Sequence, residues 1–150
     1  MAQSLDSTIA KALMEGTIIP AHPLALTESL QLDEKHQRLL TRYYMAAGAG
    51  GVAVGVHTTQ FAIRDPKIGL LEPVLKMAAE EIEKAGLQSP FIKVAGVCGA
   101  EKQAIAEAKL ARNYGYHLGL LSLGGLNNYS DEALIDHVKA VAEEIPVIGF

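Results

Sequence analysis

The chain has 150 residues, of which 49% are hydrophobic and 20% are charged, and its net charge is -4. This balance is typical of a single globular domain with an aliphatic core, and the interspersed charges argue against a nucleic-acid partner. No apolar run approaches the roughly 20 residues that span a bilayer, and the single cysteine, Cys98, excludes an intrachain disulfide. The totals predict a soluble, cytoplasmic protein without a nucleic-acid or membrane partner.

Hydrophobic periodicity alternates along the chain between amphipathic stretches and short apolar runs. A lead-in helix is expected over residues 6–13, ended by Gly16, and the apolar run that follows at residues 17–21 is expected to be the first strand. Asp33 is typical of a helix N-cap, because its carboxylate can accept a hydrogen bond from a free first-turn amide. The helix behind it is expected to bury one face, made of residues spaced three and four apart: Leu39, Leu40, Tyr43, Tyr44 and Ala47.

The same unit of helix and strand is expected to recur along the rest of the chain. After a strand at residues 51–56, helices are expected near residues 70–85, 101–113 and 130–144, followed by strands at residues 91–95, 117–121 and 146–150. Strands that are apolar on both faces and separated by amphipathic helices predict an α/β protein with a parallel sheet. Periodicity leaves two architectures open: a doubly wound, flavodoxin-like sheet, and part of a (β/α)₈ barrel, which needs about 250 residues.

Ligands bind at the carboxyl ends of the strands in both architectures, so the residues that follow each strand are the candidates for function. The polar residues there are His22, His57, Thr58, Thr59, Gln60, Cys98, Ser122, Asn127 and Asn128. Two adjacent hydroxyls at a strand end could hold a small carboxylate and pass a proton along a chain of hydroxyls. Threonine pairs also commonly turn the chain out of a strand, and spacing alone favours that simpler role.

The histidines, the cysteine and one lysine each admit a chemical and a structural interpretation. His57 could be a general base or a metal ligand, but no Asp or Glu stands at metal-ligand spacing, which favours a partnered structural histidine; His22 is open to the same two interpretations. No neighbour of Cys98 argues for a lowered thiol pKa, which favours a buried, inert thiol. Lys93 could form an imine if burial lowered its pKa, but a lysine that extends its amine to the rim or pairs with a carboxylate is favoured.

Four segments together carry a resemblance to a known family: Ile19-Pro20-Ala21-His22-Pro23, Ala47-Gly48-Ala49-Gly50-Gly51, Val56-His57-Thr58-Thr59 and Pro146-Val147-Ile148. They resemble the dihydrodipicolinate synthase and N-acetylneuraminate lyase family, whose Gly-Thr-Thr-Gly-Glu motif falls on the third segment. The family fold is a (β/α)₈ (TIM) barrel of about twice this length. The resemblance therefore implies that residues 1–150 are the N-terminal portion of a single barrel domain, with about five strands and four crossover helices after a short lead-in helix, ending inside the fifth strand.

The resemblance also implies an activity. The family condenses or cleaves pyruvate and other 2-oxo acids through a Schiff base to a strand-six lysine, without a cofactor. Carried over to this chain, Thr58 and Thr59 would bind the substrate, with His57 beside them, and Thr59 would be the catalytic residue that relays protons. A homo-oligomer, a dimer or a tetramer, is expected as well.

This sequence departs from the family pattern at several positions. His57, Gln60 and Phe61 stand where the motif has Gly, Gly and Glu, the strand-four Tyr-Tyr-Asn has no counterpart, and Phe150 falls near the strand-five tyrosine. The strand-six lysine is not within these residues, so the chain alone is expected to be inactive. Two alternatives stay open: a barrel of the same frame with different chemistry, and a non-catalytic half-barrel that self-associates through an open strand edge.

Overall fold

The computed structural model of the chain describes residues 1–149. The elements in chain order are α1 (Ser7–Glu15), α2 (Glu34–Ala46), β1 (Gly51–Val54), the 3₁₀ turns η1 (His57–Thr59) and η2 (Phe61–Arg64), α3 (Leu71–Ala85), β2 (Ile92–Val97), α4 (Glu101–Asn113), β3 (Leu118–Leu121), α5 (Asp131–Ala142) and β4 (Val147–Gly149). The expected helices are confirmed to within a few residues of their ends. Within residues 1–149, no helix is both long and apolar enough to span a membrane.

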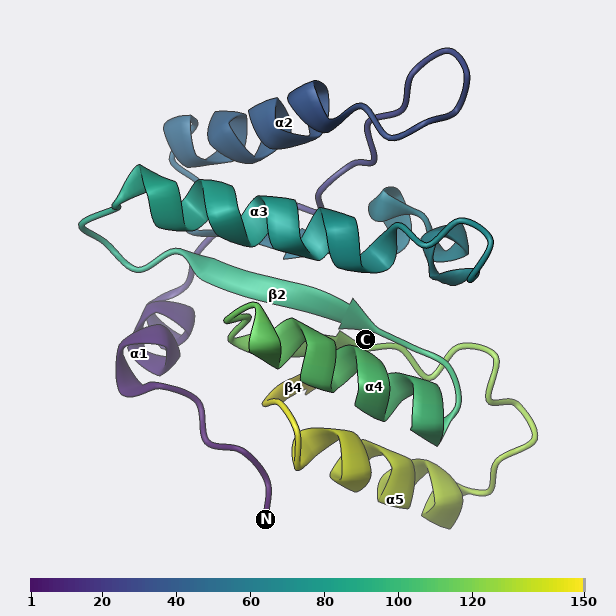
Figure 1. Cartoon of the computed structure of the whole chain (residues 1–150). Coiled ribbons are helices and arrows are strands. Elements are labelled where there is room, and N and C mark those ends of the chain that lie inside the picture. The colour runs from purple at the N-terminus through teal and green to yellow at the C-terminus, as the bar shows by residue number, and fades with distance from the viewer. Residues whose placement is uncertain (150) are drawn as a thin grey trace.

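The four strands form one parallel sheet in the order β1-β2-β3-β4. Because every crossover steps in the same direction, right-handed connections put all the crossover helices on the same face of the sheet. Figure 1 shows this arrangement, with α2, α3, α4 and α5 following one another from top to bottom. A flavodoxin-like sheet reverses its strand order and carries helices on both faces, so the observed order excludes that alternative.

The apolar run expected as the first strand is extended but irregular. Gly50 N donates to Ile18 O at 3.0 Å and Ala53 N donates to Pro20 O at 2.9 Å, so the segment lies beside β1 in the position of a first strand. Its bridge to the sheet is a single parallel pair, Ala21 with Ala53. Pro20 has no amide to donate, which prevents a regular ladder on that side. The prediction of a full strand there is wrong, although the path of the chain is the expected one.

The sheet separates two apolar layers, as alternation of side chains along each strand requires. On the outer face, Val52 and Val54 pack against the crossover helices. On the inner face, Ile92 and Val94 of β2 pack against Leu118 of β3, and α1 adds its buried residue Ile9 to them. The lead-in helix thus covers the inner face near the start of the strands and leaves the carboxyl ends uncovered.

The buried face of α2 differs from the one that the sequence predicted. Leu39 and Tyr43 are 50% and 63% exposed, whereas Gln37 and Thr41 are buried. The reason is a tertiary contact: Thr41 Oγ1 lies 2.9 Å from Nε2 of the buried His22, and the amide of Gln37 hydrogen-bonds to the same loop. Polar residues therefore hold α2 to the segment after the first extended run, and three residues of the predicted apolar face, Leu39, Tyr43 and Ala47, are exposed.

Candidate functional site

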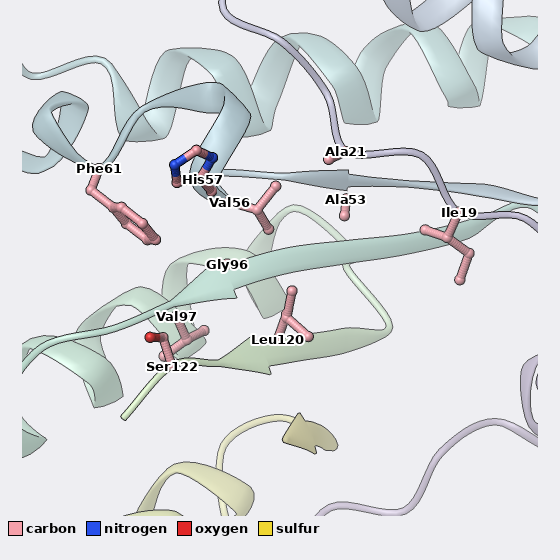
Figure 2. Close-up of a pocket in the computed structure, with 10 residues that line it drawn as sticks. All are labelled: Ile19, Ala21, Ala53, Val56, His57, Phe61, Gly96, Val97, Leu120 and Ser122. Atoms are coloured by element: carbon pink, nitrogen blue, oxygen red, sulfur yellow. The ribbon is translucent and has the colours of Figure 1, made fainter. Parts of the chain in front are cut away.

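A cavity of about 380 Å³ opens on the inner face of the sheet towards the carboxyl ends of the strands. Its walls are mostly apolar, and the residues that line it are Ile19, Ala21, Ala53, Val56, His57, Phe61, Gly96, Val97, Leu120 and Ser122. Figure 2 shows His57 and Phe61 at one end of the cavity and Ile19 at the other, with Ser122 beyond β3. Apolar walls with a few polar groups at one end are typical of a site for a small ligand.

The threonine pair lies in η1, directly beyond β1, and both hydroxyls point at one carbonyl group. Thr59 is buried, and its Oγ1 donates to His22 O at 2.6 Å and accepts from Gly55 N at 3.1 Å. Thr58 is exposed, and its Oγ1 donates to the same His22 O at 3.2 Å. The hydroxyl of Thr58 therefore has the longer bond and free access to solvent, whereas the hydroxyl of Thr59 is held on two sides.

The hydrogen bonds of Thr59 anchor the turn. Within residues 1–149, the chain of hydrogen bonds runs from the Gly55 amide to Thr59 Oγ1 and from there to His22 O. His22 O is a peptide carbonyl oxygen, which does not take up or release protons at neutral pH, so this chain of bonds does not relay protons. In the family that the sequence resembles, this proton relay also uses a tyrosine of strand four and a tyrosine of strand five, so the relay predicted for Thr59 would need both. This sequence lacks the first, and the position expected for the second, Phe150, lies outside the described residues. The relay therefore stays a prediction.

The two histidines have different surroundings. His22 is fully buried, with Nδ1 2.7 Å from Pro23 O and Nε2 2.9 Å from Thr41 Oγ1. A neutral ring with its proton on Nδ1 satisfies both bonds, and burial lowers the pKa of His22, with the bond to Pro23 O opposing it. His57 is exposed, and its ring makes a T-shaped contact with Phe61 at 6.2 Å between centroids. The buried, hydrogen-bonded ring of His22 fits the structural interpretation. His57 lines the cavity, and its role stays a prediction.

A buried ion pair beside the site was not predicted from the sequence. Arg64 Nε donates to both carboxylate oxygens of Glu107, at 2.9 and 3.0 Å, and the two side chains are 8% and 7% exposed. Arg64 Nη2 also donates to Gly55 O at 2.8 Å and to Gly96 O at 3.0 Å. A signal was present in the sequence, because Glu107 shares the buried face of α4 with small residues: Ala104, Ala108 and Ala111. A lone acid on such a face indicates a buried charge that needs a cation.

Cys98 follows β2 and is half-buried, a little more open than expected. Its amide donates to Glu107 Oε2 at 3.1 Å. Burial raises the pKa of the Cys98 thiol, and the negative charge of Glu107 raises it further, while Arg64 opposes both effects. The thiol is therefore protonated at neutral pH, which agrees with the expectation of an inert cysteine.

Lys93 lies away from the candidate site. It belongs to a separate cavity of about 550 Å³ on the outer face, whose lining also includes Glu83 of α3 and the residues that end α4. Burial lowers the pKa of Lys93, and the charge of Glu83 opposes that shift. Because Lys93 faces the helices, its amine does not reach the cavity beside Thr58.

Comparison with solved structures gives close matches to two kinds of enzyme. Dihydrodipicolinate synthase from Bacillus anthracis matches with a TM-score of 0.76 and 21% identity over 89% of this chain and 44% of that one. Dihydrodipicolinate synthase from Bacillus clausii matches with a TM-score of 0.78 and 16% identity over 94% and 46%. N-acetylneuraminate lyase from Fusobacterium nucleatum matches with a TM-score of 0.75 and 18% identity over 89% and 45%. The chain has the fold of the N-terminal half of a (β/α)₈ barrel.

The resemblance seen in the sequence is thus confirmed in three dimensions, over less than half the length of these enzymes. No family model and no curated protein matches the sequence. At such identities the likeness establishes the fold, and chemistry has to be argued from the residues at the site.

Proposed function

We propose that this chain forms half of a lyase or aldolase barrel that acts on pyruvate or another 2-oxo acid through a Schiff base. The observation that carries the proposal is the location of Thr58 and Thr59: they follow a barrel strand at its carboxyl end and come directly after His57, which lines an apolar cavity. The fold around them is that of two kinds of lyase. We also propose that the protein is cytoplasmic and a homo-oligomer, a dimer or a tetramer, without a nucleic-acid or membrane partner. The exposed apolar face of α2 supports self-association.

The chemistry assigned to each group follows from its surroundings. Thr58 Oγ1 turns from His22 O to donate to the substrate carboxylate, because its present bond is long and exposed. Within residues 1–149, no lysine lines the cavity, so we infer that the reacting amine comes from the remaining barrel units. The chain alone then binds a 2-oxo acid weakly and does not turn it over.

The test uses a polypeptide that carries this chain and the remaining barrel units. Incubation with a panel of 2-oxo acids and sodium borohydride reduces any Schiff base to a stable amine, which mass spectrometry detects and peptide mapping locates. We expect an adduct on a lysine outside residues 1–149 and less of it in Thr58→Val, with Thr27→Val, an exposed loop threonine, as the matched control. No adduct with any acid of the panel would overturn the proposal.

A second candidate is a barrel of the same frame with different chemistry, and His57 favours it. The imidazole of His57 stands beside the cavity at a position where the family motif has Gly. If His57 is a general base for another reaction, His57→Gly abolishes activity, whereas for a Schiff-base lyase the same change leaves adduct formation intact. The third alternative, a self-associating half-barrel without catalysis, predicts that the isolated chain scatters light as an oligomer and that the longer polypeptide gives no adduct.

A further inference from the structure

The segment from His57 to Arg64 carries the threonine pair. Two of its residues, Thr59 and Arg64, hydrogen-bond to the backbone of Gly55. The Gly55 amide donates to Thr59 Oγ1 at 3.1 Å, and the Gly55 carbonyl accepts from Arg64 Nη2 at 2.8 Å. Gly55 has φ of 75°, a backbone conformation that side chains disfavour. The orientation of this one residue therefore links the guanidinium of Arg64 to the hydroxyl of Thr59.

Arg64 is itself held in place by the carboxylate of Glu107, both of whose oxygens accept hydrogen bonds. Glu107 accepts from Arg64 Nε, from Cys98 N at 3.1 Å and from Gln103 Nε2 at 2.8 Å. The second contact of Arg64 Nη2, with Gly96 O, ties the same guanidinium to the end of β2. The close approach of the two strand ends needs glycine, because a Cβ at Gly96 would collide with the Gly55 carbonyl.

Two features indicate that this arrangement fixes geometry at the expense of stability. Gln60 has φ of 73°, an unfavourable conformation for a residue with a side chain, which persists only where the surroundings determine it. Among the described residues, the buried Nη1 of Arg64 has no hydrogen-bond partner. Buried ion pairs with such gaps contribute little to folding, so their value lies in holding groups in place.

We propose that the Arg64–Glu107 pair is a positioning device that fixes the Thr58–Thr59 pair beside the cavity. The link runs from Glu107 through Arg64 and Gly55 to Thr59, whose hydroxyl donates to the carbonyl that Thr58 also uses. Arg64 and Glu107 are not among the residues that line the cavity, and they act through Gly55. The role in substrate binding rests on the proposed function, whereas the link itself does not.

Arg64→Lys tests the link, because a lysine keeps the charge opposite Glu107 but lacks the planar fork that reaches Gly55 O and Gly96 O together. Glu107→Gln, which keeps the shape and one acceptor oxygen but removes the charge opposite Arg64, is the second variant. Arg38→Lys is the matched control, since Arg38 pairs with Glu80 at 2.8 Å between α2 and α3, away from the cavity.

The measurement is amide hydrogen exchange resolved by residue with NMR, in which the Gly55 amide reports its bond to Thr59 directly. We expect exchange at Gly55 in Arg64→Lys and Glu107→Gln to rise about tenfold or more beyond any rise at the amides of β3. The Arg38→Lys control should stay close to wild type. A uniform rise over the whole chain would mean a structural role alone and overturn the proposal. An unchanged Gly55 amide in both variants would overturn it as well.

Pyruvate added to the same samples separates this inference from the proposed function. We expect pyruvate to shift the Thr58 and Thr59 amide signals in the wild type and to shift them less in Arg64→Lys. If pyruvate shifts nothing in the wild type while Gly55 is still freed by Arg64→Lys, the assigned substrate is wrong and the positioning link stands. If pyruvate binds both proteins equally, the link does not serve binding and the proposal fails.

Discussion

Thr59→Val tests whether the buried threonine anchors the turn, as its contacts indicate. The substitution keeps the shape of the side chain and removes the hydroxyl. The amide of Gly55 then loses its acceptor, and His22 O loses its 2.6 Å bond while keeping the longer one from Thr58. A buried donor left without a partner costs about 1–3 kcal/mol, and a lost hydrogen bond contributes about 1 kcal/mol more.

We therefore expect Thr59→Val to lower the free energy of unfolding by about 2–4 kcal/mol. Thr58→Val is the matched control, because it removes one bond of 3.2 Å from an exposed residue, and a change of about 0.5 kcal/mol or less is expected. Urea denaturation of the three proteins, followed by circular dichroism at equal protein concentration, gives both values. Equal stabilities for the two variants would refute the reasoning, since the two hydroxyls would then be interchangeable.

Three further predictions concern pH, thiol reactivity and the faces of the helices. Burial lowers the pKa of His22 below its unfolded value of about 6.5, so the folded state holds the neutral ring and is most stable above that pH. The urea midpoint of unfolding should therefore fall as the pH drops from 7 to 5.5, and a midpoint that does not change with pH would contradict this. Glu107→Gln removes a charge that raises the pKa of Cys98, so iodoacetamide should alkylate the variant faster at pH 8, and an equal rate would count against the assignment. Leu39→Ser should change the free energy of unfolding by about 0.5 kcal/mol or less, whereas Leu75→Ala in the core should lower it by about 2–5 kcal/mol in the same urea assay. Similar losses in the two variants would mean that Leu39 is buried, as the sequence predicted.

The elements of the fold were predictable where their causes are local. Asp33 caps α2 through a bond from the His36 amide, and Gly86 ends α3 in the left-handed conformation, both as their neighbours in the sequence indicate. The buried face of α2 was not predictable, because it depends on His22, a residue outside that helix. The periodic pattern of Leu and Tyr in α2 does not show that Gln37 and Thr41 are the residues that become buried.

The candidate site was predictable in position and not in detail. Parallel strands bring their carboxyl ends to one edge, which is why Thr58 and Thr59 could be expected at the same end of the sheet as the cavity. Their hydrogen-bond partner lies 36 and 37 residues away in the sequence, and Arg64 and Glu107 are 43 residues apart. Contacts over such separations depend on the packing of α4 on the sheet, which no local pattern encodes.

Gln60 offers a separate test of the conformation of the loop. Its φ of 73° is one that glycine adopts without steric cost, and the family motif has Gly at this position. Gln60→Gly relieves strain of about 1–3 kcal/mol and adds about 0.5–1 kcal/mol of backbone entropy in the unfolded state, so a net gain of about 1 kcal/mol is expected in urea denaturation. Gln60→Ala, which keeps a Cβ, should gain nothing. If Gln60→Gly were instead less stable than the wild type, the backbone at Gln60 would carry no strain, and the departure from the motif would have changed the path of the loop as well as the residues that face the cavity.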